Sequence, residues 1–178
     1  MIYMEYWKEL QNSIDSLDHQ KIHLAQSMIV DCAKRGNTIF TAGNGGSAST
    51  AEHASCDIGK GLSIKTERKF PVISLMSNLS LNSAWSNDES YEEALAKILQ
   101  SLGKKKDLII LISGSGNSRN ILNAAQMAKD LEIIIIAMTG FDGGKLAKYA
   151  DLEIRTQSND MQIVENMHLA ILHSMLKI

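Results

Sequence analysis

The sequence predicts an α/β protein in which a five-stranded parallel sheet lies between two layers of helices, a flavodoxin- or Rossmann-like sandwich. Short apolar, β-branched runs alternate with helical segments from residue 38 onwards, and this alternation is typical of a parallel sheet covered on both faces. A length of 178 residues with 44% hydrophobic and 21% charged residues suits one domain over residues 1–178. Two glycine- and serine-rich segments each follow an apolar run and precede a helical one, as expected where a parallel sheet binds its ligands.

The elements follow from local patterns. A long amphipathic helix is predicted over Tyr3–Lys34 from the helical spacing of its apolar residues, and Gly36 is expected to end it. Residues 1–35 are expected to serve in packing or oligomerisation. The expected strands are Thr38–Ala42, Val72–Leu75, Leu108–Ser113, Ile133–Met138 and Leu152–Arg155. The expected helices are Ser47–Lys60, Leu79–Ser86, Ser90–Leu102, Ser118–Lys129, Gly144–Tyr149 and Asp160–Leu176. Ser90 and Glu93 have the spacing of a capping box.

Composition argues against several classes of protein. A formal net charge of −2 offers no electrostatic footprint for nucleic acid or an anionic membrane. No apolar stretch approaches the ~20 residues needed to span a bilayer, and the N-terminus lacks the basic and apolar regions of an export signal. We therefore expect a cytoplasmic protein. Cys32 and Cys56 have no metal-like spacing and are expected to be buried thiols.

The two glycine–serine segments indicate an anion site. They are Gly43-Asn44-Gly45-Gly46-Ser47 and Ser113-Gly114-Ser115-Gly116-Asn117-Ser118. The N–H groups at a helix N-terminus favour an anion, glycine permits close backbone approach, and serine hydroxyls add neutral donors. Neither segment carries the lysine of a P-loop, which argues against a nucleoside triphosphate with magnesium. We expect a phosphomonoester of a sugar, bound by Asn44, Gly45, Gly46, Ser47, Ser113, Gly114, Ser115 and Ser118.

Two helices carry candidate acid, base and metal-binding side chains. His53 and Asp57 are four residues apart and therefore share a helix face. They could act together on an ion or a substrate, or they could form only a surface histidine–aspartate pair. Glu165 and His168 are three apart, a spacing compatible with shared metal ligation, although His168 is equally suited to a packed or capping role. His173 lies ~12 Å beyond Glu165 along a straight helix. One ion could therefore bind both only if two subunits contribute or the helix is broken.

Three segments together resemble a known family. Gly43–Ser47, Ile112–Ser118 and Thr139-Gly140-Phe141-Asp142-Gly143-Gly144-Lys145 closely resemble the SIS (sugar isomerase) domain. Within it, the chain is most similar, over essentially its whole length, to the phosphoheptose isomerases. The resemblance implies an aldose–ketose isomerase that converts sedoheptulose 7-phosphate to D-glycero-D-manno-heptose 7-phosphate through a cis-enediol. That reaction begins ADP- or GDP-heptose biosynthesis for lipopolysaccharide, capsule or surface glycan. A homotetramer with its active site at a subunit interface is also implied.

The resemblance assigns roles to individual residues. It implies one zinc ion per subunit on His53, Asp57, Glu165 and His173, with Asp57, Glu165 and His173 also catalytic. The chain departs from the family at two of these positions, because Asp57 replaces the usual Glu and Glu165 the usual Gln. Both departures keep the site acidic, which suits a divalent cation.

Two further segments are interpreted through the same resemblance. Asn87 and Asp88 resemble an Asn-Asp pair whose aspartate contacts substrate hydroxyls, although the dipeptide is also ordinary turn chemistry. Gly114 stands where the family commonly has Thr, so one donor is lost and a roomier pocket is expected. His19 and His23 are interpreted as solvated or interfacial.

Two alternative functions stay open at this point. Some similar SIS proteins are non-catalytic phosphosugar-binding or protein-interaction factors, including a type that associates with the replication initiator. The other alternative is an isomerase of a different sugar phosphate, a pentose, a hexose or a modified heptose.

Overall fold

The computed structural model describes residues 2–177 and contains a five-stranded, all-parallel sheet in the order β2-β1-β3-β4-β5. The strands are β1 (Ile39–Gly43), β2 (Val72–Ser74), β3 (Leu108–Ser113), β4 (Ile134–Thr139) and β5 (Leu152–Arg155). The predicted sheet is confirmed, and each predicted strand end lies within one residue of the observed one.

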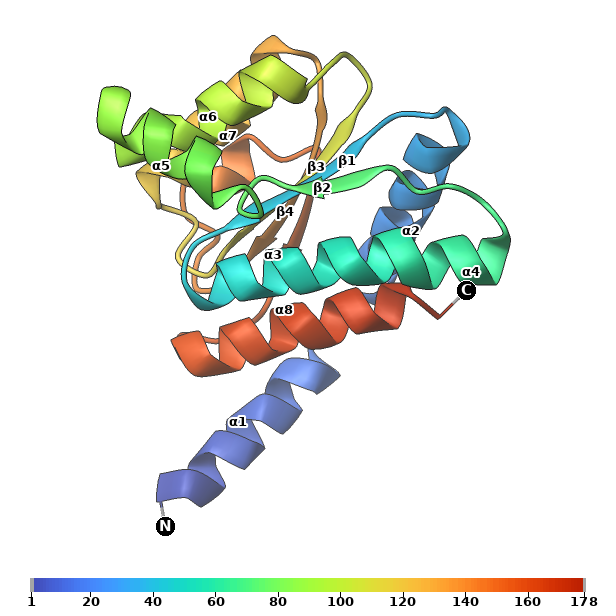
Figure 1. Ribbon diagram of the computed structural model, residues 1–178. Coiled ribbons are helices and arrows are strands. Elements are labelled where there is room, and N and C mark those ends of the chain that lie inside the picture. Colours follow the sequence, from blue (N-terminus) through green and yellow to red (C-terminus); the bar gives the residue numbers. More distant parts are fainter. Residues whose placement is uncertain (1, 178) are drawn as a thin grey trace.

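Helices cover both faces of this sheet. On one side lie α2 (His19–Lys34), α3 (Gly46–Cys56) and α8 (Met161–Met175), and α3 and α8 run side by side (Figure 1). On the other side lie α5 (Leu79–Asp88), α6 (Tyr91–Leu102) and α7 (Arg119–Asp130). Shorter elements are the π-helix η1 (Asp57–Leu62), α4 (Ser63–Thr66) and the 3-10 helix η2 (Leu146–Lys148). Among residues 2–177, none of the helices combines the length and apolar content that crossing a bilayer requires.

The central strand shows why the sheet needs two helical layers. Leu108, Ile110 and Ile112 pack into the core beneath α2, α3 and α8. Ile109 and Leu111 point the other way, into the core beneath α6 and α7. Because successive side chains of a strand face opposite sides, a continuous apolar run is buried only when both faces are covered.

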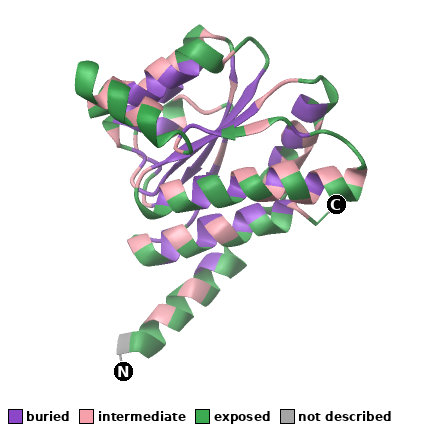
Figure 2. Ribbon diagram, viewed as in Figure 1, coloured by how far each residue is buried: buried purple, intermediate pink, exposed green. Residues whose placement is uncertain are grey.

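The prediction of one long N-terminal helix is wrong. The chain forms α1 (Ile2–Asp15) and a separate α2, because Asp18 adopts a non-helical conformation and caps α2. Its carboxylate accepts hydrogen bonds from the backbone N–H groups of Gln20 and Lys21, both at 3.1 Å, which is the usual role of an N-cap aspartate. Helix α1 leaves the body beneath α8 and is largely exposed along its length (Figure 2). Gly36, with a φ of +71°, lies just after the end of α2 as predicted.

Three other predictions need correction. The helix that follows β1 does not stop at residue 60 but continues through η1 and α4 to Thr66. The segment predicted as the helix Gly144–Tyr149 forms only the single turn η2, because two preceding glycines have positive φ. Cys32 is buried, and burial raises the pKa of its thiol to about 11, whereas Cys56 is exposed.

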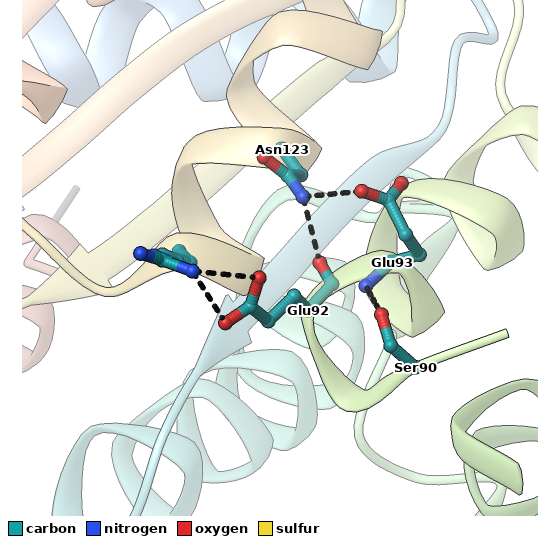
Figure 3. A network of polar contacts seen from close by, with 5 residues as sticks. Ser90, Glu92, Glu93 and Asn123 are labelled. Carbon is teal, nitrogen blue, oxygen red and sulfur yellow. Dashed lines mark hydrogen bonds and ion pairs between the residues drawn. The ribbon is translucent and has the colours of Figure 1, made fainter.

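Polar side chains fasten α6 to α7. The Ser90 hydroxyl accepts a hydrogen bond from the Glu93 N–H at 3.2 Å, which confirms the predicted cap (Figure 3). The Glu93 carboxylate accepts instead from Asn123 on α7, at 2.6 Å, and the same amide donates to the Glu92 carbonyl at 3.1 Å. Arg119 pairs with the Glu92 carboxylate at 3.1 Å. The starts of both helices are thereby held together.

Candidate active site

The two glycine–serine loops lie next to each other. They follow β1 and β3, which are adjacent parallel strands, so both loops stand at the same edge of the sheet. In the first loop, Gly45 has a φ of +54° and immediately precedes α3. In the second, Ser118 is the N-cap of α7, and its hydroxyl makes no capping hydrogen bond within the described chain. The hydroxyl is thus available to a ligand.

A cavity of about 160 Å³ opens between the loops. Asn44 and Ser47 line it from the first loop, and four residues of the second loop line it opposite: Ser113, Gly114, Ser115 and Ser118. The N-terminal part of α8 closes it with Met161 and Glu165. The structure therefore brings together most of the residues predicted to bind phosphate, in a cradle rich in hydroxyl donors.

Glu165 lies against the N-terminus of α3. A Cβ atom on Gly46 would come within 2.6 Å of the Glu165 Cδ atom, so the absence of a side chain at Gly46 is what admits the carboxylate. A negative group at this place is favoured by the N-terminal end of the helix dipole.

Three other predicted residues converge further along the same two helices. His53 belongs to α3, Asp57 begins η1 and His173 belongs to α8. The Asp57 Oδ2 atom lies 3.2 Å from the His53 Nε2 atom and 3.4 Å from the His173 Nε2 atom. The two Nε2 atoms are 3.1 Å apart. Asp57 thus stands at the junction of the α- and π-helical turns, and π-helical turns frequently occur at functional sites.

This group of three could hold a metal ion. Its ligand atoms all lie within 4.8 Å of one another. Tetrahedral zinc, bound at about 2.0–2.1 Å by imidazole nitrogen and carboxylate oxygen, places neighbouring ligand atoms about 3.3 Å apart. The three observed separations are close to that value. Two imidazoles and one carboxylate also form a donor set that catalytic zinc accepts, with a fourth position left for substrate or water. The residues therefore fit such an ion.

Glu165 does not join this group within residues 2–177. Helix α8 is continuous between Glu165 and His173, so a broken helix does not bring them to one ion. The contribution of a second subunit is the alternative that stays open.

His168 does not share a metal with Glu165. It is fully buried, and its Nε2 atom lies 3.0 Å from the Thr139 carbonyl oxygen. Burial lowers the pKa of His168 to about 4. Its Nδ1 atom is buried without a hydrogen-bond partner in the described chain. Of the roles considered for His168, a packed side chain in the core is therefore the correct one.

Asn87 and Asp88 lie apart from the cavity lining. They form the last turn of α5 rather than a turn after it, both are exposed, and the Asn87 amide donates to the Asp88 carboxylate at 2.9 Å. His19 and His23 are exposed on α2 and gain no third ligand among residues 2–177.

The expected roomier pocket at Gly114 is wrong. A Cβ atom at this position would lie 2.5 Å from the Met161 sulfur and 3.4 Å from a Val164 methyl group. The Met161 thioether therefore fills the space that a side chain at position 114 would take.

Sequence reasoning missed Met161, Asn120 and Tyr91. Asn120 is 3% exposed and pairs with Asn44, and Tyr91 donates to Asn44. Asn120 lies two residues after the second loop, and this was the available signal. Nothing local pointed to Tyr91.

Comparison with known proteins identifies the family. The model of the SIS domain matches residues 2–140. The phosphoheptose isomerase of Colwellia psychrerythraea is 40% identical over 161 residues, covering 88% of this chain and 81% of the relative. That of Helicobacter pylori is 35% identical over 176 residues, covering 96% and 88%.

Solved structures agree. A phosphoheptose isomerase from Francisella tularensis superposes with a TM-score of 0.88 at 30% identity, covering 98% of this chain and 92% of that one. The enzyme from Neisseria gonorrhoeae gives a TM-score of 0.87 at 25% identity, with the same coverage. Both structures cover 98% of this chain, so the similarity extends over nearly its whole length. The chain therefore belongs to the SIS-domain family and, within it, to the phosphoheptose isomerases.

Proposed function

We propose that the protein converts sedoheptulose 7-phosphate to D-glycero-D-manno-heptose 7-phosphate through a cis-enediol, at the start of ADP- or GDP-heptose synthesis for a surface glycan. Its family makes it an aldose–ketose isomerase. The single observation that carries the residue roles is the group His53, Asp57 and His173, which lies 3.1–3.4 Å atom to atom on the two helices that also close the phosphate cradle.

The layout suits a long sugar phosphate. The N-terminal residues of α3 and α8 lie at the cradle. The His53–Asp57–His173 group lies further along, on the later residues of α3 and α8 and at the start of η1. The reacting carbons of a heptose 7-phosphate are at the opposite end of the carbon chain from the phosphate. A phosphate held by the serine loops would thus direct those carbons toward this group, and binding energy from the phosphate would position them.

The roles follow from this layout. Asp57 removes the carbon-bound proton, with Glu165 as the other candidate base, and His173 moves protons between the two substrate oxygens. A carboxylate and an imidazole can do both near neutral pH when their surroundings tune them. A zinc ion on His53, Asp57 and His173, with Glu165 of the partner subunit as the fourth ligand that the family resemblance implies, would polarise the carbonyl group and stabilise an enediolate.

We further propose a homotetramer whose active site lies at a subunit interface. Helix α1 supports this, because it exposes a set of large apolar side chains that a lone subunit leaves in water: Tyr3 (58% exposed), Met4 (47%) and Trp7 (61%). Exposed apolar groups gathered on one element favour association. A monomer by light scattering would contradict this part of the proposal.

The test is turnover of sedoheptulose 7-phosphate by the purified protein, followed by NMR of the product, with and without a chelator and added zinc. An aldoheptose phosphate whose formation stops on chelation and returns with zinc supports both the reaction and the metal. Product that survives chelation keeps the reaction and removes the metal. Phosphate binding without turnover would favour another sugar phosphate or a non-catalytic binding protein.

Two variants distinguish the candidate bases. If Asp57 is the base, Asp57→Asn lowers kcat by about 10²–10⁴-fold with little change in phosphosugar binding, as loss of a general base does. If Glu165 is the base, Glu165→Gln has that effect instead. Asp31→Asn is the control, because Asp31 sits on the outer surface of α2 in an exposed pair with Lys34. Equal loss of kcat and of binding in both variants would refute a base at either position.

A further inference from the structure

The two phosphate loops are joined by a reciprocal amide pair. The Asn44 Nδ2 atom donates to the Asn120 Oδ1 atom at 2.8 Å, and the Asn120 Nδ2 atom donates to the Asn44 Oδ1 atom at 2.8 Å. Asn44 belongs to the first loop, and Asn120 lies in the first turn of α7, directly after the second loop. The pair therefore sets the separation of the two walls of the cradle.

The orientation of both amides is determined by neighbouring donors. The Asn120 Oδ1 atom also accepts from the Ile121 backbone N–H at 3.0 Å, and a backbone N–H cannot act as an acceptor. Asn120 must therefore turn its oxygen to that side and its NH₂ group toward the oxygen of Asn44. On the other side, the Tyr91 hydroxyl donates to the Asn44 Oδ1 atom at 2.7 Å.

This arrangement decides what Asn44 can offer a ligand. An amide oxygen accepts two hydrogen bonds through its two lone pairs, and those of Asn44 are used by Asn120 and Tyr91. Of its two amide hydrogens, one is donated to Asn120 within the described chain. Because Asn44 lines the cavity, it presents an N–H donor there and no acceptor. Such a donor suits an acceptor oxygen, and it binds the oxygen of an oxyanion more strongly than a neutral one.

Tyr91 is well placed to hold this state. It follows the Ser90 cap as the first residue of α6, in the turn that Asn123 and Arg119 fasten to α7 (Figure 3). Tyr91 and Asn120 thus approach Asn44 from two helices that are locked together at their starts. Tyr91 itself is outside the cavity lining, so its effect on a ligand passes through Asn44.

We propose that Tyr91 is a positioning residue, which orients the Asn44 amide as a donor to the substrate phosphate and couples the two phosphate loops through Asn120. That the substrate is a heptose phosphate rests on the proposed function. That phosphate binds here rests on the cavity alone.

The decisive variant is Tyr91→Phe, which removes only the hydroxyl group. Loss of one such hydrogen bond corresponds to a loss of about 3- to 10-fold in affinity. We therefore expect the KM for sedoheptulose 7-phosphate and the Kd for inorganic phosphate to rise by about that factor, with kcat changed less than about twofold and the Tm unchanged. The control is Tyr149→Phe, since Tyr149 follows η2, packs on the core beneath α6 and α7 and is also outside the cavity lining.

A second pair of variants tests whether Tyr91 affects phosphate binding through Asn44. In an Asn44→Ala background, Tyr91→Phe should have no further effect on the Kd for phosphate, because residues that act as a unit are not additive. An unchanged Kd in Tyr91→Phe, a fall in kcat alone, or a full effect in the Asn44→Ala background would each overturn the inference. Calorimetry with inorganic phosphate needs no turnover. If the wild type binds phosphate but does not isomerise the heptose, the proposed function fails and the effect of Tyr91 on phosphate affinity still decides this one.

Discussion

Gly140 packs directly against the helix that carries Glu165 and His173. It directly follows β4, and a Cβ atom there would lie 2.5 and 2.7 Å from the two methyl groups of Val164 and 3.2 Å from its Cβ atom. Val164 is fully buried on α8. A β-branched side chain in a helix has essentially one rotamer, so Val164 cannot turn away from an added methyl group. We therefore predict that Gly140→Ala pushes α8 outward.

The magnitude follows from the overlap. Ordinary carbon contacts begin near 3.5 Å, so the new methyl group would overlap both Val164 methyl groups by most of an ångström. Overpacking of this kind costs about 1–3 kcal/mol, and for a chain of this size each kcal/mol lowers the Tm by about 2–4 °C. Gly140→Ala should therefore lower the Tm by roughly 3–10 °C.

Thermal unfolding followed by circular dichroism measures this change. Gly61→Ala is the control for adding a methyl group without a clash, because a Cβ atom on Gly61, in η1, meets nothing within 4 Å. That variant should unfold at the wild-type temperature or slightly above it. Adding Val164→Ala to Gly140→Ala should cost less than the sum of the single changes, since the smaller side chain leaves space for the methyl group. A Gly140→Ala protein that unfolds within 1 °C of wild type would show that the added methyl group does not clash with Val164.

Two further predictions concern residues beside the cavity and in the core. Burial holds the pKa of His168 at about 4 against its ordinary 6.5, so the unfolded chain takes up a proton as the pH falls from 6.5 to 4 and the native protein does not. The contribution of His168 to the free energy of unfolding is complete above pH 6.5 and falls by up to about 3 kcal/mol as the pH drops through that window. His168→Gln keeps a donor for the Thr139 carbonyl but does not titrate, so denaturant unfolding between pH 7 and 4.5 should show a smaller loss of stability in this variant. An equal loss of stability with pH in the variant and the wild type would contradict the prediction. Gly114→Ala should displace the Met161 thioether and raise the KM for the phosphosugar. Adding Met161→Ala should relieve that rise, with a coupling energy of about 1 kcal/mol between the two changes. Strictly additive effects on KM would show that the two side chains do not compete for space.

Much of the architecture was readable from local pattern. The strand Leu108–Ser113 was predicted without error because a β-branched apolar run needs no long-range information to be recognised. The caps at Ser90 and Asp160 act as local signals, since each contacts backbone groups two or three residues away. Asp18 is an equally local signal, and the break between α1 and α2 lies there. The apolar periodicity of Tyr3–Lys34 nevertheless led to the prediction of one continuous helix.

The composition of the candidate site was also within reach of the sequence. The spacing of His53 and Asp57 places both on one helix face, and the structure confirms their contact. The length of helix between Glu165 and His173 indicated that they would not meet at one place. The observed α8 is one continuous helix, and Glu165 lies outside the His53–Asp57–His173 group.

The layers, the positions of both glycine–serine loops and the residue types available for chemistry can be predicted without the structure, because they depend on periodicity, capping and turn residues within a few positions of one another. Which side chains meet depends instead on how distant segments pack. The His53–His173 contact spans 120 residues and the Asn44–Asn120 pair spans 76. Both depend on how closely α3, α7 and α8 pack against the sheet and one another. That closeness is set by small volumes such as the missing side chains of Gly46 and Gly140, whose consequences appear only once distant segments are packed.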